Sequence, residues 1–131
     1  MSKHTDTEVV RRLYQALADH DLDAAGSCFA PDAVWVLPGR SPIAGRHEGW
    51  QAIRDEFLTK LAPLSGGTFR ARLIDVAVGD EYVVAVQHAT GEREGRHLDI
   101  TGCQLMSVKD GLIVEVHGHY SDQEALDRFW T

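Results

Sequence analysis

The chain has 131 residues, of which 44% are hydrophobic, and its formal net charge is −7 with histidine counted as neutral. Length and composition indicate one globular domain, residues 1–131, with a core large enough to need no disulfide bonds. The negative charge disfavours nucleic acids and anionic membrane surfaces as partners, because phosphate binding needs a basic face. The N-terminal residues are polar and no long apolar run follows, so we expect a cytoplasmic protein without a membrane span.

The first part of the chain predicts two helices followed by a strand. Residues 5–8 (Thr-Asp-Thr-Glu) are typical of a capping box, and the apolar residues of 9–17 recur at three- and four-residue spacings, which indicates an amphipathic helix. A second, shorter helix is predicted over residues 22–29, and residues 33–37 are predicted to form a strand.

The rest of the chain predicts one more helix and then mainly strands. Residues 38–49 contain two prolines and three glycines, which indicates a long loop. A third helix is expected over residues 50–61, ended by Pro63 and the following glycines. Four strands and a short terminal helix are predicted at residues 68–78, 81–90, 97–109, 112–120 and 122–130. This order indicates the α+β class, with a curved antiparallel sheet that forms a cone around the N-terminal helices.

The strands 97–109 and 112–120 carry the most informative pattern in the sequence. Every second side chain of a strand faces the same way. One face of the first strand carries Leu98, Ile100, Gly102, Gln104, Met106 and Val108, which is an apolar row with one amide. One face of the second strand carries Leu112, Val114, Val116, Gly118 and Tyr120, and Asp122 follows. A mostly apolar surface with a few polar groups is typical of a small-molecule pocket.

Several segments resemble the SnoaL-like branch of the nuclear-transport-factor-2-like superfamily, which includes ketosteroid isomerase. They are residues 9–17 (VVRRLYQAL), 21–24 (DLDA), 29–35 (FAPDAVW), 45–49 (GRHEG), 52–57 (AIRDEF) and 109–115 (KDGLIVE). The resemblance implies an α+β cone with a deep apolar pocket, commonly in a homodimer packed through the outer face of the sheet. The superfamily holds isomerases, cyclases, dehydratases, epoxide hydrolases and pure binding proteins, so the fold alone does not define an activity.

The catalytic positions of the ketosteroid isomerases are not retained in this sequence. Leu37 aligns with the general-base aspartate, and Leu13 aligns with the tyrosine of the first helix. Tyr14, one residue further on, is expected to point about 100° away from that position. Gln104 replaces the protonated aspartate, and its amide can still donate a hydrogen bond to a carbonyl.

The catalytic set of the limonene epoxide hydrolases is also incomplete. Asp122 aligns with one of its aspartates, but residues 87–89 (Gln-His-Ala) hold neither the arginine nor the second aspartate. Asp122 is alternatively the N-cap of the last helix. Gln87 and His88 face opposite ways, so one of them is expected to enter the cavity, and His88 would there be a general base.

These observations define a candidate site. We predict that Gln104 polarises a substrate oxygen and that Asp122 or His88 moves a proton. The predicted ligand-contacting residues are Tyr14, Trp35, Leu37, Trp50, Gln87, Met106, Val116 and Tyr120.

No cofactor and no metal is expected. His117 and His119 are neighbours on one strand face, but strand alternation places them opposite the apolar row, on the outer face of the sheet. We expect a homodimer to form through this face, which is also predicted to present Cys103, Leu105 and Ile113.

Two functions follow from the predicted pocket, and a third interpretation stays open. The first is the binding of a largely apolar small molecule, with cofactor-independent isomerisation, cyclisation, dehydration or epoxide opening as its chemistry. The alternative is a non-catalytic ligand-binding or carrier domain. In the third interpretation the cone is filled by its own side chains and the domain is structural.

Overall fold

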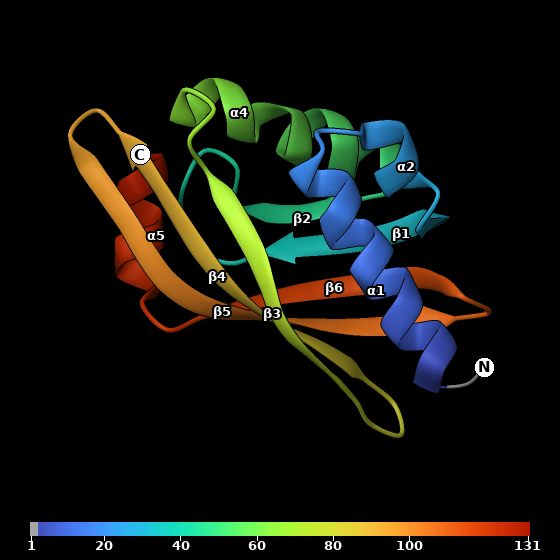
Figure 1. Ribbon diagram of the computed structural model, residues 1–131. Coiled ribbons are helices and arrows are strands. Elements are labelled where there is room, and N and C mark those ends of the chain that lie inside the picture. Colours follow the sequence, from blue (N-terminus) through green and yellow to red (C-terminus); the bar gives the residue numbers. More distant parts are fainter. Residues whose placement is uncertain (1–2) are drawn as a thin grey trace.

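The structure, a computed structural model, describes residues 3–131 (Figure 1). Its elements in chain order are α1 (Lys3–Ala18), α2 (Leu22–Gly26), β1 (Phe29–Leu37), β2 (Gly45–Glu48), α3 (Trp50–Ala52), the π-helix η1 (Ile53–Leu58), α4 (Thr59–Ser65), β3 (Arg70–Val78), β4 (Val83–Arg93), β5 (Arg96–Lys109), β6 (Leu112–Tyr120) and α5 (Gln123–Trp130). In the described residues, no helix is both long and apolar enough to cross a membrane.

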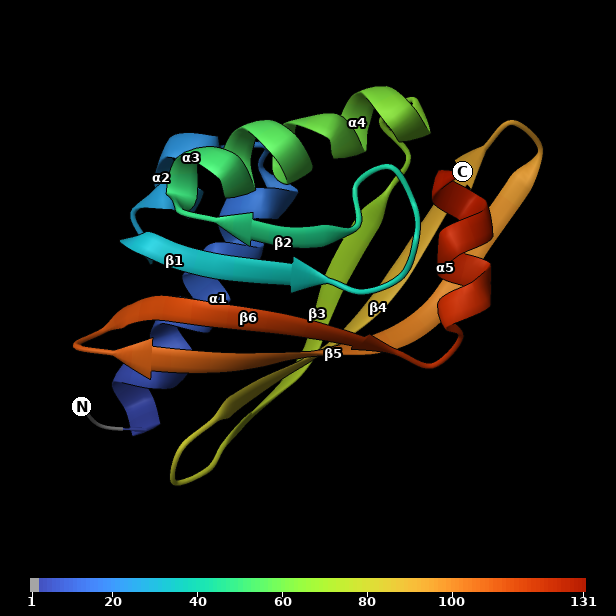
Figure 2. The ribbon, with the colours of Figure 1, turned by 180° about the vertical axis from the view of Figure 1, so that it is seen from behind.

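The six strands form one curved sheet in the order β2-β1-β6-β5-β4-β3. Helix α1 lies across one face of this sheet, and the helical stretch α3–η1–α4 lies beside β1 and β2 (Figure 1 and Figure 2). Helix α5 packs against the ends of β4, β5 and β6. The sheet thus wraps around the N-terminal helices, which confirms the predicted α+β architecture.

The sheet is not antiparallel throughout, in contrast to the prediction. β1 pairs with β6 in parallel, whereas the other neighbouring strands are antiparallel. Parallel neighbours require a long connection, and here the chain between β1 and β6 forms the rest of the sheet. The predicted loop 38–49 also contains a strand, β2, which pairs with β1 from Val34 to Leu37.

Helix boundaries differ from the predicted ones at three places. Helix α1 already includes residues before Thr5, so the predicted capping box does not start it. Helix α2 ends at Gly26, and Phe29 already begins β1. The third helical stretch continues past Pro63 and ends at Ser65, with Gly66 as its C-cap. The φ of Gly66 is 62°, a left-handed value that favours glycine at a helix end.

The inward row predicted on β5 is correct, but the one on β6 is interrupted by a bulge. The residues Leu98, Ile100, Gly102, Gln104 and Met106 are all buried. Ser107 pairs with Glu115 and Val108 pairs with Ile113, so Val114 is the extra residue and the side-chain alternation reverses. Ile113 is therefore fully buried and packs in the core. Its predicted place on the outer face is wrong, as is the inward facing of Leu112 and Val114.

Candidate functional site

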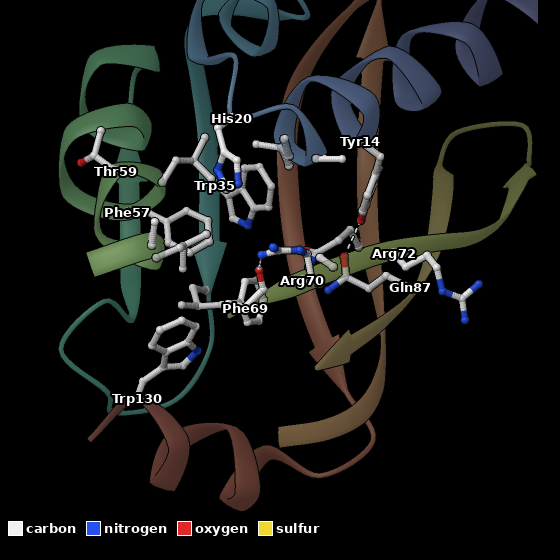
Figure 3. A pocket seen from close by; sticks show the side chains of 18 of the residues that line it. Tyr14, His20, Trp35, Phe57, Thr59, Phe69, Arg70, Arg72, Gln87 and Trp130 are labelled. Carbon is white, nitrogen blue, oxygen red and sulfur yellow. Dashed lines mark hydrogen bonds between the residues drawn. The ribbon is translucent and has the colours of Figure 1, made fainter. Parts of the chain in front are cut away.

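A cavity of about 540 Å³ lies between the sheet, α1 and the helical stretch η1–α4 (Figure 3). Its volume is typical of a pocket for a small organic molecule. Most of its wall is apolar or aromatic, from Leu17, Leu22, Trp35, Leu37, Phe57, Leu58, Leu61, Phe69, Leu126 and Trp130. The cone is therefore not filled by its own side chains, which the third interpretation assumed.

The floor of the cavity is built from one row of residues across three strands. Gln87 on β4 pairs with Gly102 on β5, and Gly102 pairs with Tyr120 on β6. A Cβ atom on Gly102 would lie 2.7 Å from Cδ1 of Tyr120, and one on Gly118 would lie 3.0 Å from its Cε2. The phenol ring therefore lies over two glycines, and a larger side chain at either position would displace it.

Gln104 and Tyr120 form the first polar pair of the cavity. Nε2 of Gln104 donates a hydrogen bond of 3.0 Å to the Tyr120 hydroxyl oxygen. Gln104 is 2% exposed, and its Oε1 is fully buried without a hydrogen-bond partner in the described residues. Burial raises the pKa of Tyr120, whereas the bond from Gln104 acts in the opposite direction. The Tyr120 hydroxyl therefore stays protonated at neutral pH.

Tyr14 and Gln87 form the second polar pair. The Tyr14 hydroxyl on α1 donates a hydrogen bond of 2.5 Å to Oε1 of Gln87 (Figure 3). Burial is the main cause that raises the pKa of Tyr14, and the nearby Tyr120 and Cys103 raise it further. The predicted ligand-contacting residue Tyr14 lines the cavity, and its hydroxyl spans the gap between helix and sheet.

The cavity wall includes three basic residues. They are His20, Arg70 and Arg72, and none of the described residues that line the cavity is acidic. Nη1 of Arg70 donates hydrogen bonds to the carbonyl oxygens of Gly67 and Phe69, at 2.7 and 2.8 Å, so this guanidinium is held by backbone. The guanidinium of Arg72 points away from Tyr14 and Gln87 (Figure 3).

The structure brings six of the predicted site residues together around the cavity. They are Tyr14, Trp35, Leu37, Gln87, Gln104 and Tyr120. Nε1 of Trp35, like Oε1 of Gln104, is a buried polar atom without a hydrogen-bond partner in the described part of the chain. Of the two neighbours Gln87 and His88, Gln87 enters the cavity, and it is 4% exposed.

Neither predicted proton carrier reaches the cavity. His88 faces the outer side of the sheet, where its Nε2 lies 2.6 Å from Oδ1 of Asp99. Asp122 is exposed at the N-terminus of α5, and its Oδ1 accepts a hydrogen bond of 2.9 Å from the Ala125 amide. Strand alternation turns His88 outward once Gln87 points inward, and Asp122 serves as the helix cap. Both catalytic assignments are corrected.

Three predicted wall residues belong to the core rather than to the cavity lining. Met106 and Val116 are fully buried within the core. Trp50 stacks on Phe29, with ring centroids 5.3 Å apart, and its indole lies against Gly26. This contact places the Trp50 ring at the end of β1, against α2.

Sequence reasoning missed the wall residues that come from the helices and the chain before β3. Phe57, Leu126 and Trp130 lie on helical stretches whose apolar residues recur at the spacing of an amphipathic helix. That spacing identifies a buried face, but it does not show that the faces of η1 and α5 border the same cavity. Phe69 packs against Trp130 with tilted rings whose centroids are 5.1 Å apart, and no sequence signal identified it as a wall residue.

The fold and the cavity define a small α+β protein whose curved sheet encloses a ligand-sized space. A family model described as SnoaL-like domain matches residues 10–116. The chain therefore belongs to the SnoaL-like family.

Relatives match over nearly the whole chain. The uncharacterized protein Rv0034 of Mycobacterium tuberculosis is 33% identical over 132 residues, which covers 100% of both chains. The structure of Bal32a, from a soil-derived mobile gene cassette, has a TM-score of 0.93 and 35% identity and covers 98% of each chain. An NTF2-like protein from Burkholderia xenovorans has a TM-score of 0.83 at 23% identity, with coverage of 100% and 99%. This last likeness shows the shared fold.

Proposed function

We propose that the protein binds a small, largely apolar organic molecule in the cavity between the sheet and α1. The observation that supports this best is the cavity itself, whose volume of about 540 Å³ is bounded mainly by apolar and aromatic side chains. Its polar groups include two amide–phenol pairs, Tyr14–Gln87 and Gln104–Tyr120. A few hydrogen-bonding groups in an apolar wall are what orients a small ligand.

A cofactor-independent isomerase, cyclase, dehydratase or hydrolase is the second candidate. The amides and phenols favour it, because hydrogen-bond donors in an apolar cavity polarise a substrate oxygen more strongly than in water. This candidate needs a proton carrier other than His88 and Asp122, which lie outside the cavity lining.

Recovery of the natural ligand tests the proposal. The purified protein is extracted with organic solvent, and the extract is analysed by mass spectrometry. Ala71 lines the cavity, so Ala71→Trp is expected to exclude the molecule, whereas Ala77→Trp on the exposed part of the same strand is the control. A compound found with the wild type and the control but not with Ala71→Trp supports binding. Equal extracts from all three proteins contradict it.

The same compound separates the two candidates. It is incubated with fresh protein and followed by chromatography. Conversion identifies an enzyme, and recovery of unaltered compound identifies a carrier.

We also propose that the protein forms a homodimer through the outer face of the sheet. This face carries Leu105 and the half-buried Cys103, and a groove of about 220 Å³ there is lined by Tyr82, Leu105, Ser107, Glu115, His117 and His119. Light scattering is expected to show a dimer at micromolar concentration, and Leu105→Glu is expected to dissociate it. A wild-type monomer contradicts the proposal.

A further inference from the structure

The hydrogen-bond directions in the cavity make the two floor residues donors. Oε1 of Gln87 accepts the Tyr14 hydrogen, and no described residue accepts a hydrogen bond from its Nε2. Figure 3 shows the Gln87 oxygen turned toward Tyr14 and its nitrogen turned toward the side of Arg70 and Phe69. Tyr14 thus fixes which end of the Gln87 amide faces the ligand.

Gln104 has the corresponding effect on Tyr120. The Tyr120 oxygen accepts a hydrogen bond from Nε2 of Gln104, so one of its lone pairs is occupied. Its own hydrogen has no acceptor in the described residues. A phenol that accepts one hydrogen bond is left with its O–H to donate.

The hydrogen bonds of the floor leave two hydrogens unengaged. One lone pair of Gln87 Oε1 accepts from Tyr14, and Oε1 of Gln104 is fully buried beside Gly118. The hydrogens without an acceptor in the described residues are those of Nε2 of Gln87 and of the Tyr120 hydroxyl, so the floor offers two donors. A ligand hydroxyl can accept from these donors, but its own hydrogen then needs an acceptor of its own.

We propose that Nε2 of Gln87 and the hydroxyl of Tyr120 form a two-donor site for a ligand carbonyl oxygen, with Tyr14 and Gln104 as positioning residues. The two donor residues flank Gly102 in one row of the sheet, and the ring of Tyr120 lies over this glycine. The ligand class is an apolar ketone or a related carbonyl compound. This inference rests on the proposed ligand-binding function and adds the chemistry of the group that the floor recognises.

The test uses three probes of nearly equal shape: acetylnaphthalene, the corresponding naphthyl ethanol, and ethylnaphthalene. We expect the wild-type protein to bind the ketone about 3- to 10-fold more tightly than the hydrocarbon for each donor that it engages. The alcohol is expected to bind more weakly than the ketone. Calorimetry measures the affinities, and infrared difference spectra follow the carbonyl stretch, which shifts to lower frequency when donors bind the oxygen.

Variants assign the donors and the positioning residues. Gln87→Leu and Tyr120→Phe are expected each to lower the ketone affinity about 3- to 10-fold and to remove part of the frequency shift, with the hydrocarbon affinity unchanged. Tyr14→Phe frees the Gln87 amide and is expected to broaden the carbonyl band. The matched control is His88→Leu, because His88 follows Gln87 on the strand but lies on the outer face of the sheet. This variant is expected to change neither the ketone affinity nor the carbonyl stretch.

The outcomes separate this inference from the proposed function. If none of the three probes binds, the ligand-binding function itself is contradicted. If all three bind equally and the carbonyl stretch does not change in Gln87→Leu or Tyr120→Phe, the cavity binds apolar molecules but the two-donor site is refuted. If the alcohol binds more tightly than the ketone, the floor offers an acceptor and the assigned amide directions are wrong.

Discussion

Replacing Gln104 with methionine is expected to leave the protein equally stable or more stable, although Gln104 is almost fully buried. The substitution removes the hydrogen bond from Nε2 to Tyr120, which contributes about 1 kcal/mol. It also removes the buried Oε1, which has no partner in the described residues and whose desolvation costs about 1–3 kcal/mol. Methionine is unbranched and of similar length, so no cavity should form. The net change is about 0–2 kcal/mol in favour of the variant.

The matched substitution Gln87→Met is expected to have the opposite sign. It removes the acceptor of the Tyr14 hydroxyl, and Tyr14 is only 6% exposed. An unpaired buried donor of this kind costs about 1–3 kcal/mol. The two variants therefore differ by about 1–5 kcal/mol in expected stability, although the exchanged residue types are identical.

Urea unfolding, followed by tryptophan fluorescence, measures the free energy of unfolding for both variants. Thermal unfolding gives a second reading, with roughly 3–5 °C expected per kcal/mol for a chain of this length. If Gln104→Met is destabilised as much as Gln87→Met, then Oε1 of Gln104 has a partner and the reasoning is refuted. Otherwise Gln104→Met gains stability and loses ketone affinity, which is expected when a residue serves binding at the expense of stability.

Three further results are expected. Gly102→Ala places a Cβ 2.7 Å from the Tyr120 ring and should lower the free energy of unfolding by about 1–3 kcal/mol, measured in urea, with a loss of ketone binding. Burial raises the pKa of Tyr14 and Tyr120 above 10.0, so the folded state holds these protons more tightly than the unfolded state does. The free energy of unfolding should therefore fall as the pH rises above 10.0. The same dependence of this free energy on pH in Tyr14→Phe would argue against this. Asp127 is 4% exposed and accepts a hydrogen bond of 3.1 Å from the Arg40 amide, so Asp127→Ala should lower the midpoint of thermal unfolding by more than Asp127→Asn does.

The sequence alone indicated the fold class, the family and much of the cavity floor. The alternation on β5 correctly placed Gln104 inward among Leu98, Ile100 and Met106. The terminal helix was also located within one residue of its observed start. These features depend on local periodicity and on short motifs, and both are visible in residues that are close together in the sequence.

Only the tertiary structure decided which face of each strand borders the cavity and which side chains meet there. Alternation shows that Gln87 and His88 face opposite ways, but the packing of α1 on the sheet decides that Gln87 is the inward residue. The bulge at Val114 reversed the facing of Ile113, since one extra residue inverts every side chain beyond it. The contact between Tyr14 and Gln87 joins residues 73 positions apart, and the direction of its hydrogen bond, which makes the floor a donor surface, exists only once helix and sheet are packed together.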